Sequence, residues 1–208
     1  MFEGYPPSFD AEEAVAIVAS VFEEAEPERW DSTFFPLETR VDVQGRQVLE
    51  VLRAVEARGL RVWLDGGWGV DALLRKQTRD HEDVDIVVEL DKVDELARTL
   101  GSLGFELVED FLPTRAVLRS ADSGQVDVHP VTFDGDGVGW QRGAGPDGAD
   151  CPYPADGFGQ GRLLGSTVPC LTAEVQLEHH CGYEPRERDR RDMAALAQAY
   201  GLVLPRPS

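Results

Sequence analysis

Residues 61–90 have the sequence RVWLDGGWGVDALLRKQTRDHEDVDIVVEL, and the elements expected within them indicate the fold class. An apolar strand is expected over residues 61–64, and the paired glycines at 66–67 make a turn that opens a helix through residues 71–75. A second strand is expected over residues 84–90, where β-branched residues dominate. A strand, a glycine turn, a helix and another strand in succession indicate an α/β fold with a mixed sheet.

Periodic apolar positions predict further elements on both sides of this stretch. In chain order they are an amphipathic helix within residues 14–25, a helix through Val48–Val55 stopped by Gly59, a helix through Val93–Leu103 closed by Gly104, strands over 105–108, 115–119, 125–131 and 162–169, and helices over 172–181 and 186–200. The Gly-, Pro- and Asp-rich residues 134–161 indicate a long loop. Three parts are therefore expected: an acidic N-terminal extension (1–40), an α/β core (41–133), and a loop with a C-terminal helical part (134–208).

The charge of the chain excludes several classes of partner. There are 39 acidic and 20 basic residues, a formal net charge of -19. Duplex nucleic acids and anionic membrane surfaces both require a basic face, so neither is an expected partner.

The expected location is the cytoplasm. No apolar run approaches the roughly 20 residues of a membrane span, and residues 1–10 lack the basic region of a secretory signal. The three cysteines, Cys151, Cys170 and Cys181, form no disulfide or zinc spacing, which favours a reducing compartment.

Asp83 and Asp85 are the first residues that indicate chemistry. Side chains alternate along a strand, so both carboxylates leave from one face while Val84, Ile86 and Val88 enter the core from the other. Two like charges this close repel unless a cation compensates them, and Mg²⁺ prefers carboxylate oxygens. The alternative is a pair of solvated acids at a strand edge.

The surrounding sequence favours the metal site. Gly66 and Gly67 stand between a strand and a helix, where the backbone can approach a ligand and helix N–H groups face an anion such as a triphosphate. A third acid, Asp127, also lies between β-branched residues of an expected strand. Three carboxylates and a glycine turn outline a phosphoryl- or nucleotidyl-transfer site.

The runs Trp63–Asp71, Thr78–His81, Asp83–Ile86 and Val126–Pro130 resemble the antibiotic nucleotidyltransferases of the polymerase-β-like superfamily. The chain is most similar to the small lincosamide nucleotidyltransferases and more distantly to the aminoglycoside nucleotidyltransferases. Three more stretches also resemble this group: Leu112–Arg115, Pro169–Glu174 and His180–Tyr183. The resemblance spans most of residues 60–200 and implies a nucleotidyltransferase core at 41–133.

The resemblance implies a reaction and its central residues. Asp83, Asp85 and Asp127 are implied to hold two Mg²⁺ ions, and the glycine turn to seat the triphosphate. An NMP, with AMP from ATP favoured, would pass to a hydroxyl of a small antibiotic with loss of pyrophosphate. Asp127 is the first candidate for the general base, and His129, which faces the same way, is the second.

Other residues are expected to contact the two substrates. Arg79 and His81 precede the paired acids and are expected at the nucleotide, while Trp68 stands where the superfamily often has Ser, so backbone N–H groups must bind the phosphates there. The expected acceptor-binding residues in the late helix and just after it are Glu178, His179 and Tyr183.

Several alternatives stay open at this point. The acceptor is expected to be a lincosamide first and an aminoglycoside second, and the acidic field would attract a cationic acceptor. A protein-modifying nucleotidyltransferase of a toxin–antitoxin pair and a nucleotide-sensing protein without turnover are the other hypotheses. The extension at 1–40 is expected to remodel the acceptor pocket or to form the surface of a homodimer.

Overall fold

The computed structural model describes residues 42–179 and 185–204. The helix expected within residues 14–25, the boundary expected at residue 40, and Tyr183 lie outside the described residues. The helices are α2 (Gly45–Glu56), α3 (Gly66–Leu74), α4 (Val93–Gly101), α5 (Ala173–His179) and α6 (Glu187–Tyr200). The strands are β1 (Val62–Leu64), β2 (Asp83–Glu89), β3 (Glu106–Phe111), β4 (Arg115–Ser120), β5 (Gly124–Phe133), β6 (Gly139–Gln141), β7 (Cys151–Tyr153), β8 (Phe158–Leu163) and β9 (Ser166–Leu171).

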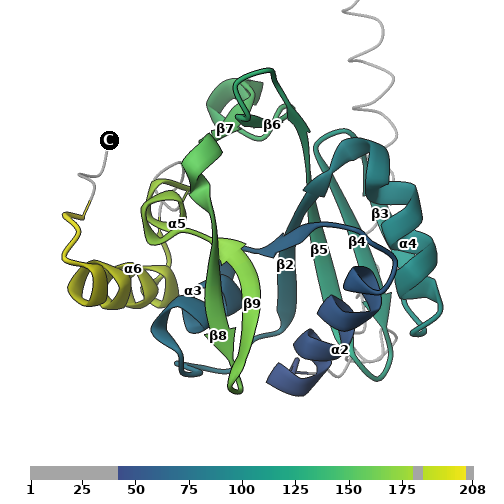
Figure 1. Ribbon diagram of the computed structural model, residues 1–208, viewed down its shortest axis with the longest axis horizontal. Coiled ribbons are helices and arrows are strands. Elements are labelled where there is room, and N and C mark those ends of the chain that lie inside the picture. The colour runs from purple at the N-terminus through teal and green to yellow at the C-terminus, as the bar shows by residue number, and fades with distance from the viewer. Residues whose placement is uncertain (1–41, 180–184, 205–208) are drawn as a thin grey trace, which may run out of the picture. The chain divides into compact units, whose positions relative to one another are not determined.

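The strands of the described part form one mixed sheet in the order β3-β4-β5-β2-β1-β9-β8, and the short β6–β7 pair extends from the end of β5. Strand β2 lies at the centre, parallel to β5 and antiparallel to β1. The mixed α/β fold predicted from the sequence is therefore confirmed (Figure 1).

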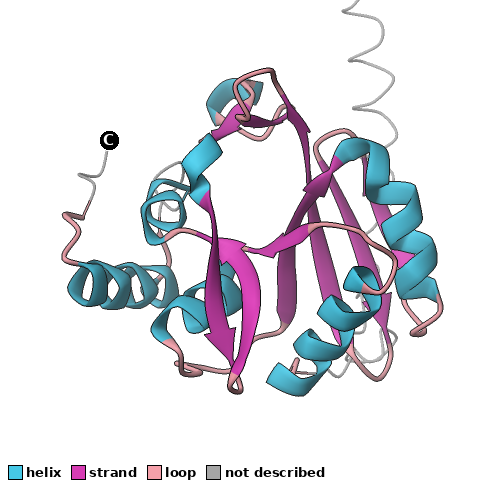
Figure 2. Cartoon of the chain, in the orientation of Figure 1, coloured by secondary structure: helices cyan, strands magenta, loops and turns pink. Residues whose placement is uncertain are grey.

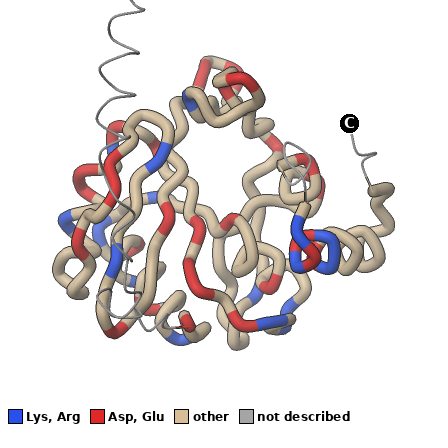
Figure 3. Tube along the Cα trace, turned by 180° about the vertical axis from the view of Figure 1, so that it is seen from behind, with Lys and Arg blue, Asp and Glu red and all other residues tan. Residues whose placement is uncertain are grey.

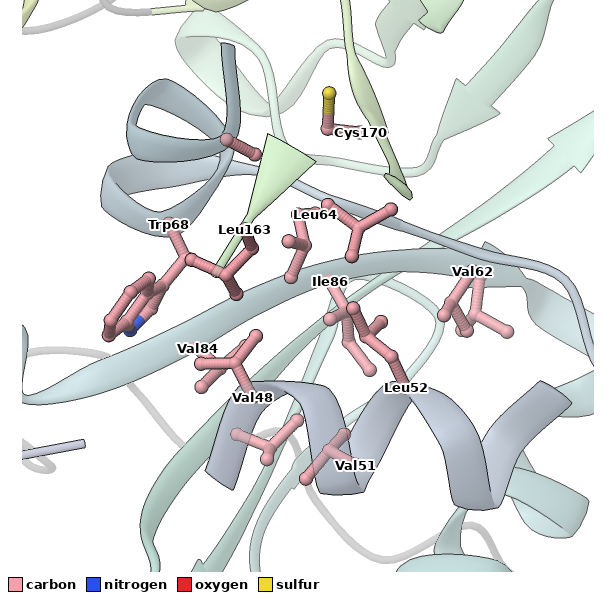
Figure 4. Close-up of a cluster of buried hydrophobic side chains, with 14 of the residues drawn as sticks. Val48, Val51, Leu52, Val62, Leu64, Trp68, Val84, Ile86, Leu163 and Cys170 are labelled. Carbon is pink, nitrogen blue, oxygen red and sulfur yellow. The ribbon is translucent and has the colours of Figure 1, made fainter. Parts of the chain in front are cut away.

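The alternation along β2 divides the molecule into core and site. Val84, Ile86 and Val88 are each at most 1% exposed, as the pattern predicted. They pack with residues of α2 such as Val48 and Leu52 (Figure 4). The burial of these branched side chains holds the strand in register, because a slip of one residue would turn every one of them out of the core. The same alternation sends Asp83 and Asp85 to the opposite face.

The helices cover the sheet in two groups (Figure 2). Helices α2 and α4 contact one another beside β3. Helix α3 contacts β8, β9 and β2, and α6 packs on α3 and α5. Helix α6 thus lies close to α3, the helix that begins at the paired glycines. None of the helices in residues 42–179 and 185–204 combines the length and apolarity that a membrane crossing requires.

The long loop predicted over residues 134–161 is wrong. These residues contain β6, β7 and the first part of β8, linked by two turns of 3-10 helix. Glycine, aspartate and proline make up most of these residues, and β6 and β7 have only three residues each, too few for an alternating pattern to stand out. The predicted strand at 162–169 is likewise a β8–β9 hairpin whose turn contains Gly165.

The helix after the glycine turn begins earlier than predicted. Helix α3 starts at Gly66, so both glycines belong to its first turn, and the Asp65 side chain accepts a hydrogen bond from the Gly66 N–H at 2.7 Å. Asp65 is therefore the N-cap of α3, a position at which Asp is strongly preferred. The helix predicted over 172–181 is α5, described as far as His179.

Candidate active site

The glycine turn lies directly against the paired acids. Gly66 has a φ of +54°, and a Cβ added there would overlap a carboxylate oxygen of Asp85. A Cβ added at Gly67 would overlap His81 Nδ1 and crowd the Arg79 guanidinium. Only glycine allows this close approach of backbone to side chains. The start of α3 therefore presents the N–H groups of its first turn beside Asp83 and Asp85 of β2.

Asp83 and Asp85 place two negative charges close together. Burial, and then the charges of Asp85 and Asp127, raise the pKa of Asp83 to about 6. A carboxyl group with such a pKa would be stabilised in its charged form by a cation. Two carboxylates at this spacing, beside helix N–H groups that suit phosphates, fit the donor set that Mg²⁺ uses when it binds with a nucleotide.

Asp127 lies on β5 opposite Asp85 and is held by an arginine. Arg115 Nε and Nη2 donate to the two Asp127 oxygens at 2.6 and 2.7 Å. Arg115 Nη1 also donates to Glu109 at 3.1 Å, and the hydrogen bond with Asp127 raises the Arg115 pKa. Within residues 42–179 and 185–204, no three acidic, histidine or cysteine side chains converge as a ready metal site. Of the three predicted metal ligands, Asp127 is the one whose oxygens are bound to an arginine, Arg115.

His129 lies beside Asp85 at the same edge of the sheet. Its Nε2 is 3.3 Å from Asp85 Oδ1, and its Nδ1 is 3.2 Å from Gln141 Nε2. Burial lowers the pKa of His129, but the hydrogen bond to Asp85 and the acidic neighbours outweigh it and raise the pKa to about 9. The two predicted base candidates therefore each have a carboxylate or guanidinium partner: His129 pairs with Asp85, and Asp127 with Arg115.

The expected nucleotide-binding side chains occupy two different places. Arg79 lines the cavity described below and is held by two hydrogen bonds to Asp192 of α6, at 3.0 and 3.1 Å. His81 is 1% exposed, lies 2.5 Å from Asp71 and packs against the ring of Trp68. The side chains of Trp68 and His81 lie beneath the glycine turn and do not line the cavity, so they support the turn from below.

One cavity of about 580 Å³ brings most of these groups together, but Asp127, like Trp68 and His81, does not line it. Its walls come from four regions: the glycine turn, the acidic strand ends, the β6–β7 segment and the start of α6. The lining residues are Asp65, Gly66, Gly67, Arg79, Asp83, Asp85, Thr114, Arg115, His129, Gln141, Gly143, Ala144, Cys151, Tyr153, His179, Arg188 and Asp189. Figure 3 shows basic and acidic positions side by side at the start of α6. The cavity is in the size range of small-molecule sites. The glycine turn and the acids of β2 form one wall, and β6, β7 and His179 form a chemically different one.

The expected acceptor-binding residues divide in the same way. His179 lines the cavity, with Nε2 3.7 Å from Cys151 Sγ and its ring edge-on to Tyr153. Glu178 is exposed and does not line the cavity. Of these residues, His179 alone is brought to the site within the described chain.

Several cavity residues escaped the sequence-based prediction, and Arg115, Gln141 and Tyr153 are the most informative of them. Arg115 stands in an expected strand next to that of Asp127, and a basic residue in a strand beside a strand-borne acid was the available signal. Gln141 and Tyr153 stand in β6 and β7, where a loop was expected, and no periodic pattern marked them.

Comparison with known proteins finds a matching family model and two kinds of relative. The family model described as aminoglycoside-2''-adenylyltransferase matches residues 47–196. A lincosamide resistance protein of Staphylococcus haemolyticus is 32% identical over 155 residues, which are 74% of this chain and 95% of that protein. A 2''-aminoglycoside nucleotidyltransferase of Escherichia coli is 28% identical over 126 residues, 61% of this chain and 66% of that protein.

Solved structures give the same result. The lincosamide antibiotic adenylyltransferase LnuA, in its lincomycin-bound crystal structure, has a TM-score of 0.67 at 31% identity, covering 75% of this chain and 98% of its own. The aminoglycoside enzyme ANT(2'')-Ia, in complex with adenylyl-2''-tobramycin, has a TM-score of 0.63 at 20% identity, covering 76% and 90%. At that identity the second likeness shows a shared fold.

Proposed function

The chain belongs to the aminoglycoside-2''-adenylyltransferase family of antibiotic nucleotidyltransferases, and on that premise we propose that it transfers AMP from ATP to a hydroxyl of a lincosamide-like antibiotic, releasing pyrophosphate. The lincosamide acceptor is supported by the S. haemolyticus resistance protein, 95% of which aligns, against 66% of the aminoglycoside enzyme. Cys151 and Cys170 have free thiols, which supports the proposal that the protein is a soluble enzyme of the cytoplasm.

The observation that carries this proposal is the contact between the glycine turn and Asp85. Backbone N–H groups at a helix start bind phosphate, and adjacent carboxylates hold the cation that accompanies it. Because both groups line one cavity, a nucleoside triphosphate can contact the turn while its metal lies at the acids. Arg79 and Arg188, on the same cavity, supply the positive charge that an acidic protein must offer a triphosphate locally.

Mg²⁺ would be held by Asp83 and Asp85, whereas both oxygens of Asp127, the third predicted ligand, accept hydrogen bonds from Arg115. When bound, Mg²⁺ would neutralise phosphate charge and polarise the phosphorus that is attacked. The acceptor hydroxyl attacks the α-phosphorus, the bond to the bridging oxygen breaks, and pyrophosphate leaves with that electron pair. The hydroxyl proton passes to Asp127, whose charge Arg115 preserves in the resting enzyme.

The acceptor would occupy the wall of the cavity formed by β6, β7 and His179. This wall combines the Tyr153 ring, the Cys151 thiol and the backbone of Gly143 and Ala144, an apolar surface with few polar groups. Such a lining suits a sugar-bearing drug whose ring packs on an aromatic side chain. Residues 1–40 remain a predicted source of further pocket residues or of a homodimer surface.

An aminoglycoside is the second candidate acceptor. The favouring observation is that Asp65, Asp83, Asp85 and Asp189 all line the cavity, so an amine-bearing acceptor meets carboxylates there. A cationic acceptor would lose apparent affinity as salt rises, whereas a neutral acceptor would not.

The experiment that tests the function measures pyrophosphate release by the full chain with Mg²⁺. Each of the four NTPs is combined with lincosamides, aminoglycosides and neutral sugars. The proposal expects release with ATP and a lincosamide, and its loss when Asp83 is replaced by Asn. Turnover with aminoglycosides alone would support the second candidate. Absence of turnover with every drug would overturn both and favour a protein target.

A further inference from the structure

Gln141 lies at the junction of the two substrate walls and contacts both. It is 4% exposed on β6, and its amide contacts the Thr114 carbonyl, His129 and Tyr153. Resting on the proposed function, we propose that Gln141 is a positioning residue that fixes the His129 ring so that its Nε2–H donates to Asp85.

The Thr114 carbonyl sets the orientation of the Gln141 amide. Gln141 Nε2 lies 2.7 Å from this oxygen, and a backbone carbonyl can only accept. The amide nitrogen must therefore face Thr114, because the turned-over amide would place two oxygen acceptors 2.7 Å apart. Tyr153 completes the arrangement, since its hydroxyl donates to Gln141 Oε1 at 2.8 Å. Every polar group of this buried amide is thus used.

The fixed amide leaves the neutral His129 ring one tautomer. The second N–H of Gln141 Nε2 points at His129 Nδ1, 3.2 Å away, so Nδ1 must be the acceptor. A proton on Nδ1 would set two donors against one another in a buried site, where an unmade hydrogen bond is costly. The ring proton therefore lies on Nε2, 3.3 Å from Asp85 Oδ1.

This hydrogen bond aims the Asp85 carboxylate. His129 takes Oδ1, so Oδ2 is left to face Gly66 and the nucleotide side of the cavity. Hydrogen bonds from outside a metal site commonly orient the carboxylates within it. The chain Tyr153–Gln141–His129–Asp85 thereby connects the acceptor wall to the proposed metal ligand. It also occupies both nitrogens of His129, as Arg115 occupies both oxygens of Asp127.

The test is the ¹⁵N NMR spectrum of the full-length protein labelled at histidine, recorded without substrates over a rising pH series until the His129 ring is neutral. The chain has 4 histidines, and His129→Gln assigns the resonance. The expected wild-type signature is an unprotonated Nδ1 and a protonated Nε2. A ring proton on Nδ1 of the neutral ring would overturn the proposal.

Two substitutions then test whether Gln141 is the cause. Gln141→Met keeps the side-chain length but removes the donor, and a shift of the His129 Nδ1 resonance is expected. Gln141→Glu places a carboxylate acceptor there, so the proton should move to Nδ1; this variant serves if the first fails to fold. Gln160→Met, on the exposed side of β8, is the matched control and should leave the spectrum unchanged. An unchanged His129 signature in a folded Gln141 variant would contradict the proposal.

The kinetic consequence separates positioning from simple support. Outer partners of metal ligands typically contribute 10–100-fold to affinity or activity, so Gln141→Met should lower kcat about tenfold and raise the Mg²⁺ requirement. The KM for ATP should change less than about threefold, since Gln141 lies on the acceptor side. Equal losses in every parameter would contradict a positioning role. Because the spectrum is recorded on free protein, a protein that modifies none of the drugs still yields a decisive result for Gln141.

Discussion

Arg115 Nε and Nη2 donate to the two carboxylate oxygens of Asp127, at 2.6 and 2.7 Å, from adjacent strands of the sheet. The Asp127 side chain is 10% exposed and that of Arg115 38%, so the carboxylate is the buried partner. A buried charge that loses its partner is costly, and a forked guanidinium is the geometry that matches a carboxylate. Arg115 therefore both stabilises β4 against β5 and fixes the orientation of the proposed base.

Arg115→Lys keeps the charge but removes the fork. We expect kcat to fall at least about tenfold and the free energy of unfolding to fall by about 1–2 kcal/mol. The loss of stability is smaller than for a fully buried ion pair because Arg115 is partly exposed. Steady-state kinetics and urea unfolding measure the two effects. Arg119→Lys, on the same strand, is the control and should retain wild-type kcat. Equal losses in both variants would contradict a specific role for Arg115.

Gly66→Ala tests the contact between the turn and Asp85. The added Cβ meets the Asp85 carboxylate at a positive φ, so we expect a loss of about 100-fold or more in kcat/KM for ATP. Gly59→Ala is a matched control, because Gly59 has a φ of +72° with nothing within 4 Å of the new Cβ. It should cost about 1 kcal/mol of backbone strain and leave kcat/KM intact. Similar kinetics for the two variants would refute the proposed role of the turn.

Asp83→Asn should stabilise the metal-free protein at neutral pH. The folded-state pKa of about 6 lies above the ordinary 3.8, so the folded protein binds this proton more tightly than the unfolded chain does. The contribution of Asp83 to stability is therefore complete below about pH 4 and is lost as the pH rises through 6. At pH 7.5 the substituted protein should gain on the order of 1–3 kcal/mol, discounted for partial exposure.

Urea unfolding at pH 4 and 7.5 with a chelator measures this gain, which should vanish at pH 4. The exposed Asp136→Asn should show no such pH dependence. Mg²⁺ should stabilise the wild type but not the Asp83→Asn variant, through binding to the folded state. If Asp83→Asn instead lowered the stability at pH 7.5, the negative charge of Asp83 would be compensated within the protein without a cation.

Asp127→Asn and His129→Asn distinguish the two base candidates. Loss of a general base typically costs about 10²–10⁴-fold, and loss of a residue that orients a ligand costs roughly 10–100-fold. We therefore expect the kcat of the Asp127→Asn variant to be at least about tenfold below that of the His129→Asn variant, measured by pyrophosphate release. The reverse order would make His129 the base.

The sequence predicted most elements around the site because their signals are local. The valines and isoleucine of β2 alternate with Asp83 and Asp85, and the stripe of α4 has a helical period, so both were placed within one or two residues. Asp127 stood out because it lies between β-branched residues of β5, and the resemblance then implied its role as ligand and base candidate, with His129 as the second candidate.

The remainder depends on contacts between distant residues. Gln141 and Tyr153 reach the cavity because β6 pairs with the end of β5 and β7 pairs with β6. Strands of three residues are too short for their pairing register to be predicted from the sequence. His81 looked like a phosphate ligand because it precedes the paired acids. Its burial against Asp71 follows from α3 packing over it, which a linear motif does not specify.

The most direct test is the intact mass of lincomycin after incubation with the purified full-length protein, ATP and Mg²⁺. We expect a gain of one adenylyl group per drug molecule, with one pyrophosphate released for each, and neither product with Asp83→Asn. An unmodified drug with the wild-type protein, or full adenylylation by the Asp83→Asn variant, would contradict the proposed site.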